Sequence, residues 1–443
     1  MSLRQRIEQE IRERGPIPFS RYMELCLYDP ELGYYSRNVE KFGKAGDFYT
    51  SSDVHAVFGR LLARQFDEMW RALGAPQNIE IVELGPGRGL FAQDVFDWSE
   101  KMFPDFFQAL DYTLLERSPS LRQRLEAAFR ERSAAVKVSV PCPMAGGGFH
   151  SMEQQGAPSP TTGEDARRST DRAIPSSHAG VAAETPGTEQ QHREKRHEGE
   201  GHGFSRADKS SLLTRALAPE APVIVFANEF FDALPVEILS ERGSLRISTR
   251  DGRFVEEWTA ASAEEMQYLD RYGVHPSAGA RTEVALLAQQ QTEQLAAGIK
   301  SGFLIAIDYG YTRDQQLAGR HVDTIMTYRQ HAASPNPYEA PGEQDITAHV
   351  NFTALAAAAE QNGMQAHKLL TQSQFLMGIG EATQFADAFE ECHLPQERAK
   401  VALQLKHLVT PEGMGETFHV LVASKGVESE KLAGLSGLSF AAR

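Results

Sequence analysis

The stretch IVELGPGRGLF, residues 81–91, decides the fold that we expect for this chain. It begins with the apolar residues Ile81 and Val82, reaches the acid Glu83, and then passes through Gly85, Gly87 and Gly89, spaced two residues apart. A strand that is apolar on both faces is typical of the centre of a parallel sheet, which helices cover on both sides. Because glycine has no Cβ, the backbone after such a strand can turn tightly and approach a ligand closely. We therefore predict a ligand-binding loop at the carboxyl end of a central strand.

The spacing of the glycines narrows the class of ligand. A phosphate-binding P-loop needs a lysine followed by serine or threonine, and a dinucleotide fingerprint needs G-x-G-x-x-G. Here the pattern is E-x-G-x-G-x-G, so the third glycine comes one residue earlier than in the dinucleotide fingerprint. This tighter loop is typical of class I methyltransferases, which bind S-adenosylmethionine (SAM), a nucleoside without phosphate. A dehydrogenase and a plain glycine-rich turn remain as alternatives.

A second acid stands at the end of the next predicted strand, within residues 111–118. This acid is Glu116. A ribose diol is bound by a carboxylate that accepts two hydrogen bonds at this edge of a sheet. Since NAD and SAM both contain ribose, Glu116 alone does not discriminate between them. Together, the loop spacing and Glu116 favour SAM.

Strands alternate with helices along most of the chain. The strands are predicted at 79–85, 111–118, 134–140, 303–310 and 417–424, and a fourth strand in chain order opens residues 221–235 and runs into a loop. Helices are predicted at 89–103, 118–129, 283–302, 350–362 and 395–409. Residues 236–258 alternate around Arg-Gly and Asp-Gly pairs, which predicts a small antiparallel meander. The pattern predicts an α/β fold with a doubly wound sheet, like that of class I SAM methyltransferases, and an added substrate-side region.

One long segment, residues 141–210, differs in composition from the rest. Glycine, proline, serine, threonine and charged residues dominate it, so it cannot bury enough apolar surface to offset the entropy of ordering. We expect a disordered insertion. Its histidines are irregularly spaced and no cysteine pair accompanies them, so we expect no metal site.

These observations predict an order of regions along the chain. The regions are an N-terminal helical or lid region (1–76), a first half of the SAM-binding core (77–140), the insertion (141–210), a second half of the core with the meander (211–310), an added substrate-side region (311–390), a C-terminal helix and last core strand (391–428), and a flexible tail (429–443).

The composition excludes several classes of protein. The net charge of −15 argues against a nucleic-acid binder, whose footprint would be basic. The three cysteines are widely spaced, which predicts neither a disulfide framework nor a zinc site. No apolar run is long enough to cross a membrane. The first residues have no apolar leader, and they include Glu8, Glu10 and Glu13, which an acid-poor presequence would avoid. We expect a cytoplasmic chain.

The segment FANEFFDALP, residues 226–235, follows the fourth predicted strand. It places Asn228, Glu229 and Asp232 beyond the carboxyl end of that strand, where ligands bind in open α/β sheets. Carboxylates at this position could hold a cationic acceptor such as a guanidinium group with two parallel hydrogen bonds. Alternatively, the aromatic residues pack in the core and the polar residues form a turn, a reading that fits Asp232 better than Glu229.

Five motifs occur in one order and together resemble the MidA-like SAM-dependent methyltransferases. The motifs are GDFYTSSDVHAVFG (46–59), ELGPGRG (83–89), ANEFFDALPVE (227–237), IDYGY (307–311) and PGEQDITAHVNF (341–352). The family includes the mitochondrial protein arginine methyltransferase that assists the assembly of respiratory complex I. The resemblance extends over about residues 15 to 426, without the insertion.

The resemblance implies a class I methyltransferase fold and SAM as cofactor. It implies that Glu83, the loop from Gly85 to Gly89 and Glu116 bind the cofactor, and that Thr50, Ser51 and residues 228–232 line the cleft. Two departures stand out: Ser52 replaces a proline of many members, and most members lack the insertion. In the last motif, Asn351 could cap the helix that follows, and His349 could brace a loop or act in catalysis.

The function that we predict is that of a SAM-dependent methyltransferase, with Glu229, Asn228 and Asp232 on the acceptor side. The resemblance implies a protein substrate with an exposed arginine, and a homodimer is possible. We expect neither a nucleic-acid nor a membrane partner. The rivals are a small-molecule methyltransferase, an NAD-linked enzyme, and a SAM-binding assembly factor whose catalysis is dispensable.

Overall fold

The computed structural model describes residues 1–37, 56–132, 134–140, 221–321, 323–329 and 332–440. All of them belong to one compact unit, formed by Met1–Met144 and Lys209–Arg443. The predicted insertion and both Thr50 and Ser51 lie outside the described residues. The region boundaries given above therefore remain predictions, except where packing contradicts them below.

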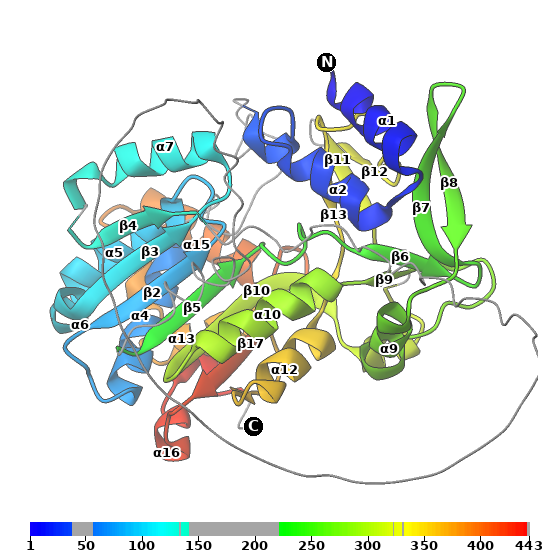
Figure 1. Cartoon of the computed structure of the whole chain (residues 1–443). Coiled ribbons are helices and arrows are strands. Elements are labelled where there is room, and N and C mark those ends of the chain that lie inside the picture. Colours follow the sequence, from blue (N-terminus) through cyan, green and yellow to red (C-terminus); the bar gives the residue numbers. More distant parts are fainter. Residues whose placement is uncertain (38–55, 133, 141–220, 322, 330–331, 441–443) are drawn as a thin grey trace, which may run out of the picture. The chain divides into compact units, whose positions relative to one another are not determined.

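A large sheet forms the centre of this unit (Figure 1). Its strands follow the order β15 (Gln365–Ala366), β17 (Phe418–Lys425), β10 (Gly302–Tyr311), β5 (Val223–Asn228), β2 (Ile79–Leu84), β3 (Leu110–Leu115) and β4 (Val136–Ser139). The five strands from β10 to β4 are mutually parallel, and β17 runs antiparallel to β10. Two short strands, β14 (Val350–Asn351) and β16 (Leu370–Thr371), pair with β10 and β17. The predicted doubly wound α/β fold is confirmed.

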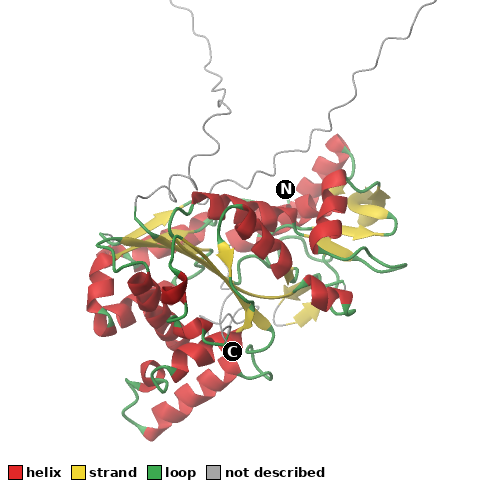
Figure 2. Ribbon diagram, turned by 90° about the horizontal axis from the view of Figure 1, so that it is seen from below, coloured by secondary structure: helices red, strands yellow, loops and turns green. Residues whose placement is uncertain are grey.

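Both faces of this sheet are buried, which explains why its central strands carry apolar residues on both faces. Along β2, Ile79 and Ile81 join one core cluster, whereas Val82 and Leu84 join another on the opposite face. Helices α4 (Ala56–Ala72), α5 (Leu90–Met102), α6 (Pro104–Ala109), α7 (Pro119–Ala128), α13 (Gln372–Glu381), α14 (Ala386–Phe389), α15 (Pro395–Val409) and α16 (Ser429–Leu432) contribute to the first cluster. Helices α10 (Leu286–Gly298) and α12 (Phe352–Gln361) contribute to the second. Figure 2 shows helices on both sides of the twisted sheet.

A second layer is built around the N-terminal helices α1 (Leu3–Arg14) and α2 (Phe19–Tyr28). These helices and the short turn η1 (Tyr34–Ser36) share a core with two small antiparallel sheets. The first sheet has the order β1 (Ile17–Pro18), β7 (Gly243–Arg250), β6 (Glu237–Ser240) and β9 (Thr282–Val284), with β8 (Arg253–Thr259) paired to β7. The second has the order β12 (Ala332–Ser334), β11 (Met326–Arg329) and β13 (Asp345–Thr347). Helices α9 (Ala263–Tyr272) and α11 (Arg313–Leu317) complete this part of the chain.

The predicted meander is formed by β6, β7 and β8. Between β7 and β8, Asp251 and Gly252 have φ values of 52° and 70°. Positive φ at both central residues is the signature of the tight hairpin turn that Asp-Gly pairs favour. The dipeptide therefore identified this hairpin from sequence alone.

The prediction of a flexible tail over 429–443 is wrong for residues 429–440. Leu432, Leu435 and Leu438 are buried in the main core, and the Ser436 backbone N–H and hydroxyl both donate to Glu68. The three leucines are spaced three residues apart, which is typical of a buried helical face. The prediction from composition did not take this spacing into account.

Candidate active site

A cavity of about 810 Å³ lies at the carboxyl ends of β2, β3, β5 and β10. The sheet order makes this position a switch point, because β3 and β4 lie on one side of β2 and β5 lies on the other. At such a point the connections diverge to opposite faces of the sheet and leave a crevice for a ligand. The loops after these strands form part of the lining, and α2, η1 and the three-stranded sheet supply the rest.

The three glycines after β2 adopt left-handed backbone for different reasons. Their φ values are 63°, 53° and 74° at Gly85, Gly87 and Gly89. Gly85 and Gly87 line the cavity, and a Cβ on Gly85 would lie 3.1 Å from Cδ2 of Phe230. Gly89 is the N-cap of α5, and a Cβ there would lie 2.6 Å from Cδ2 of Leu125. Gly89 thus serves the packing of α5 against α7, while the first two glycines face the ligand space.

Two buried carboxyl groups lie beside this loop. The Tyr112 hydroxyl donates to Glu83 Oε2 at 2.8 Å, and burial raises the pKa of Glu83 to about 8. The Ser118 backbone N–H donates to Glu116 Oε1 at 2.7 Å, and burial raises the pKa of Glu116 to about 7. Hydrogen bonding to the backbone N–H of Gly87 lowers the pKa of Glu116 and so opposes the effect of burial. This carboxyl group therefore faces the glycine loop.

The turn after β5 is held by a carboxylate from the neighbouring strand β10. Asp308 Oδ2 accepts the backbone N–H groups of Phe230, Phe231 and Asp232 at 3.0–3.2 Å. Asp308 is completely buried, and burial is the main cause that raises its pKa well above the ordinary value. This single side chain therefore fixes the backbone on which the predicted acceptor-side residues stand.

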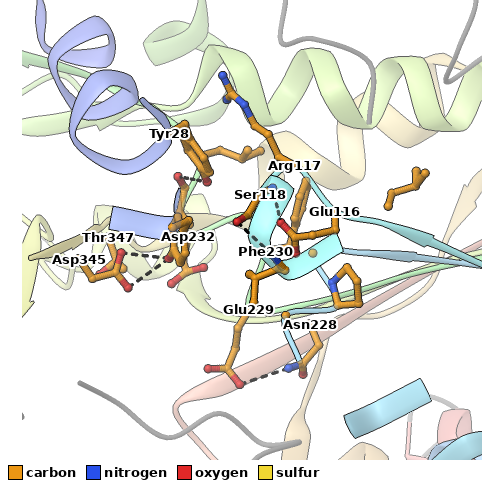
Figure 3. A pocket seen from close by; sticks show the side chains of 18 of the residues that line it. Tyr28, Glu116, Arg117, Ser118, Asn228, Glu229, Phe230, Asp232, Asp345 and Thr347 are labelled. Carbon is orange, nitrogen blue, oxygen red and sulfur yellow. Dashed lines mark hydrogen bonds between the residues drawn. The ribbon is translucent and has the colours of Figure 1, made fainter. Parts of the chain in front are cut away.

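Asn228 and Glu229 stand at the start of that turn. Glu229 has a φ of 51°, a left-handed conformation that is uncommon for a residue with a side chain. Asn228 Nδ2 donates to Glu229 Oε1 at 3.2 Å, a contact that Figure 3 shows. Backbone strain of this kind persists where the surroundings impose it, and it clusters at functional sites.

Asp232 belongs both to the turn and to the cavity wall. Its Oδ2 accepts a hydrogen bond from the Tyr309 hydroxyl, whereas its buried Oδ1 has no hydrogen-bond partner among the described residues. Burial raises its pKa to about 6. The sequence favoured a turn role for Asp232, and the structure adds an unpaired carboxylate oxygen in the wall of the cavity.

Several lining residues were not identified from the sequence. Tyr309 lies in the motif IDYGY, and Asp345 and Thr347 lie in the motif that contains QDIT, but the motifs alone assigned no role to them. Asp308, which precedes Tyr309, is not part of the lining and acts through the turn that it holds. The available signal was the position of Asp308 and Tyr309 near the carboxyl end of a predicted strand. Tyr28 and Tyr35 carried no local signal, because they reach the cavity from α2 and η1.

Residues just before α12 have two different roles: one caps the helix and another lines the cavity. The side chain of Asn351 accepts the Ala354 backbone N–H at 3.1 Å, so the predicted cap is confirmed. His349 lines the cavity, and its Nδ1 lies 3.0 Å from Nδ1 of His321. Burial lowers the pKa of His349 to about 4, so its ring is neutral at pH 7.

The cavity suits a nucleoside that carries a positive charge. One end offers a glycine loop and the carboxyl group of Glu116, which can accept hydrogen bonds from hydroxyl groups. Glu229 and Asp232 add carboxyl groups further along the same wall.

Among the described residues, no helix is apolar enough over a sufficient length to span a membrane.

Curated relatives resemble this chain over most of its length. The mitochondrial protein arginine methyltransferase NDUFAF7 homolog of Drosophila melanogaster is 28% identical over 96% of this chain and 85% of its own. The mitochondrial protein arginine methyltransferase NDUFAF7 of Danio rerio is 27% identical over 94% and 85%, and that of Homo sapiens is 25% identical over 93% and 80%.

These relatives contradict the expectation of a cytoplasmic chain, because each of them is named as a mitochondrial protein. The expectation was wrong for a physical reason. The first residues form α1, whose Leu3, Ile7 and Ile11 are buried, so their composition reports packing rather than cellular location.

A solved structure with a bound cofactor product is similar in fold. A protein from Burkholderia thailandensis, crystallised with S-adenosylhomocysteine, superimposes with a TM-score of 0.69 at 25% identity, covering 99% of this chain and 94% of its own. A native crystal structure of a protein from the same organism gives a TM-score of 0.67 at 23% identity, covering 96% of this chain and 92% of its own.

The sequence profile of a family of S-adenosyl-L-methionine-dependent methyltransferases matches residues 61–370, from α4 to the strand that precedes α13. This range contains the glycine loop, Glu116 and the turn after β5. The chain therefore belongs to the MidA-like family of SAM-dependent methyltransferases, and SAM is its cofactor.

Proposed function

We propose that this enzyme transfers the methyl group of SAM to an arginine side chain of a partner protein. Two lines of support lead to arginine. The relatives named above are protein arginine methyltransferases. The carrying observation is that carboxyl groups on the turn after β5 line the same cavity as the glycine loop, where a guanidinium group could approach the cofactor.

At the cofactor end, we assign Glu116 to the ribose hydroxyls and the backbone of Gly85 and Gly87 to close contact with the ligand. Glu83 also lines the cavity, and its hydrogen bond from Tyr112 holds the end of β2 against β3. Gly89 supports the site through the packing of α5. Thr50 and Ser51 remain predictions from the family resemblance.

At the acceptor end, we assign Glu229, Asn228 and Asp232 to orienting the guanidinium group. When bound, SAM supplies a methyl group on a sulfonium ion. Methyl transfer needs the acceptor nitrogen in line with that methyl group and shielded from water, rather than strong acid–base catalysis. A carboxylate that fixes the guanidinium plane meets this requirement, because it accepts two parallel N–H groups.

A direct test identifies the modified residue. The purified enzyme and SAM with a labelled methyl group are incubated with proteins from a strain that lacks the enzyme, and labelled proteins are digested for mass spectrometry. We expect methylarginine in at least one protein, and the same site unmethylated in the deletion strain. Label found only on lysine, on another residue type or on small molecules would refute the arginine assignment.

Glu229→Gln tests the acceptor assignment. It keeps an oxygen for Asn228 Nδ2 but removes the charge. We expect methyl transfer to fall by roughly two to three orders of magnitude, about 3–4 kcal/mol of transition-state stabilisation. SAM affinity and melting temperature should remain near normal. Glu241→Gln, at an exposed position on the β6–β7 turn, is the matched control. Unchanged single-turnover transfer in Glu229→Gln would remove Glu229 from the acceptor site.

A further inference from the structure

Strand β13 presents a second acidic surface to the cavity. Along a strand, successive side chains point to opposite faces. Asp345 and Thr347 line the cavity, whereas Ile346 between them is buried in the core of the second layer. Tyr328, the cross-strand partner of Asp345 on β11, also lines the cavity. The three-stranded sheet therefore contributes a carboxyl group, a hydroxyl group and an aromatic ring to one wall.

This wall is joined directly to the turn after β5. The Ala348 backbone N–H, which follows β13, donates to the backbone oxygen of Asp232 at 3.0 Å. Figure 3 shows Asp232 beside Asp345 and Thr347, while Glu229 is turned toward Asn228. Asp232 and Asp345 thus lie together although they belong to different layers of the protein.

The two carboxyl groups are deeply buried, but they differ in their hydrogen-bond partners. Asp345 is 2% exposed, and both of its oxygens accept the Tyr35 hydroxyl, at 3.0 and 3.2 Å. Asp232 is 7% exposed, has no ion-pair partner among the described residues, and leaves its Oδ1 without a hydrogen bond. A buried carboxylate oxygen without a partner is costly, unless a ligand supplies the missing donor.

Aromatic rings enclose the same space. Tyr28 stacks on Tyr35 with ring centroids 5.5 Å apart, and its hydroxyl donates to the backbone oxygen of Ala233 at 3.0 Å. Tyr309 donates to Asp232 and also lines the cavity. The flat guanidinium group of arginine stacks on aromatic rings and is less strongly hydrated than an ammonium group. The guanidinium group of Arg117, which pairs with Glu24, lies 4.6 Å from the Tyr28 ring centroid, so a cation of the chain itself already contacts this ring.

We propose that Asp232 and Asp345 form a paired binding site for the guanidinium group of the acceptor, with Tyr28, Tyr35 and Tyr309 as its aromatic wall. This inference rests on the proposed function and deepens it, because it names the residues that select the acceptor. Glu229 would orient the nitrogen that receives the methyl group, and the pair would hold the remainder of the cation. Asp345 belongs to β13 of the three-stranded sheet, whereas Asp232 follows β5 of the large sheet. The second layer would therefore contribute directly to the choice of substrate.

The test measures binding of simple probes to the full chain saturated with S-adenosylhomocysteine. The probes are N-acetyl-arginine methylamide, the corresponding lysine compound, and the neutral isostere made from citrulline, each titrated by NMR. We expect the arginine probe to bind wild type more tightly than the other two. Asp232→Asn and Asp345→Asn should each weaken the arginine probe at least tenfold, with little change for citrulline.

Matched measurements separate a lost site from a damaged protein. Glu343→Gln removes an exposed carboxylate two residues before Asp345, where it pairs with Arg37 and Arg329, and it should not affect probe binding. Affinity for S-adenosylhomocysteine should stay within twofold in all variants. Tyr35→Phe removes the hydroxyl that holds Asp345 and should weaken the arginine probe less than Asp345→Asn.

The outcomes distinguish this inference from the proposed function. If the arginine probe binds wild type and both Asp→Asn variants equally, the paired site is overturned and an arginine substrate is untouched. If the lysine probe binds preferentially and both variants weaken its binding, the paired site is supported as a cation-binding site. The proposal of an arginine substrate is then refuted. If no cationic probe binds wild type better than citrulline does, the paired site is overturned.

Discussion

At the scale of single residues, the glycine loop shows what a sequence motif can and cannot specify. The sequence assigned Gly85, Gly87 and Gly89 one common reason, the close approach of a ligand. The structure gives Gly89 a different reason, because its missing Cβ makes room for Leu125 and Phe129. The spacing of the motif was sufficient to predict the class of cofactor, but the neighbour that each glycine faces depends on α7 and on the turn after β5.

Gly87→Val should abolish SAM binding while the chain stays folded. The side chain would enter the cavity, and a β-branched residue at a φ of 53° adds backbone strain of about 1–3 kcal/mol. Gly252→Val is the matched control, because Gly252 has a φ of 70° and open space around its missing Cβ. Both variants should lose a few degrees of melting temperature, and only Gly87→Val should lose SAM binding in calorimetry. Normal binding by Gly87→Val would mean that Gly87 does not contact the cofactor.

The pKa of Glu116 predicts how SAM affinity depends on pH. The free protein holds this carboxyl group with a pKa of about 7, and ribose hydroxyls need its ionised form as an acceptor. Affinity should therefore rise roughly tenfold between pH 6 and pH 8, as ionisation is completed. Because the pKa in the folded state is raised above the unfolded value, the stability contributed by this group is lost as pH rises from about 5 through 7.

A comparison of two glutamates isolates this effect. Glu116→Gln should remove the pH dependence of SAM affinity measured by calorimetry. Glu283 is also buried with a pKa raised to about 7, but it accepts the Thr324 backbone N–H away from the cavity. Glu283→Gln should change the pH dependence of stability and leave that of SAM affinity intact. A dependence that persists in Glu116→Gln would assign it to another group, such as Glu83.

At the scale of elements, the sequence was most informative where burial is two-sided. Strands β5 and β10 are mostly apolar, and β2 carries apolar residues on both faces beside Glu80 and Glu83, so composition and length identified these strands. The strands β11 and β13 escaped prediction, because Met326–Arg329 and Asp345–Thr347 are too short to show a period. Their side chains nevertheless form one wall of the candidate site. A sequence can therefore predict the sheet that supports such a site more readily than the short segments that close it.

Asp308 illustrates how one element positions another. Its carboxylate on β10 accepts three N–H groups of the turn after β5, so Asp308→Asn should destabilise the fold by about 1–3 kcal/mol. The new amide group would also face the Tyr309 backbone N–H, which now donates to Oδ1. We expect kcat to fall much more than SAM affinity, because the turn carries the acceptor-side residues.

The matched control for this prediction is Asp387→Asn. Asp387 is equally buried, where it pairs with Arg64 and accepts the Trp98 indole N–H, but it does not line the cavity. Below its melting temperature this variant should retain normal kcat in single-turnover assays. If both variants lose kcat in proportion to their loss of stability, the turn has no specific dependence on Asp308.

At the scale of the whole molecule, the candidate site depends on contacts between distant parts of the chain. The hydrogen bond from Tyr35 to Asp345 joins residues 310 positions apart. Composition and motifs predicted a helical or lid region over 1–76, but nothing local indicated that Tyr28 and Tyr35 would reach the cavity. Core strands could be predicted one by one, whereas these walls exist only after the two layers have packed together.

Deletion of residues 145–208 tests the organisation predicted from composition. We expect a variant with a short glycine linker in their place to keep its melting temperature within about 3 °C, since a loop contributes little beyond its closure entropy. SAM affinity should stay within twofold, because Gly85, Gly87 and Glu116 precede the deleted segment. A loss of more than about 8 °C would show that the segment packs on the rest of the chain and that its composition was misleading.

The position of β17 has a consequence for the biosynthesis of this protein. Among the described residues β17 is the last strand in sequence order, yet it lies between β10 and β15 and pairs with β10 over eight residues, Gly302 to Tyr309. While the ribosome is still translating the preceding segment, the apolar β10 has one edge without its partner. Unpaired strand edges invite association with other chains, so the nascent protein depends on chaperones until residues 418–425 have been made. A premature stop codon shortly before Phe418 would remove β17 and prevent completion of the sheet.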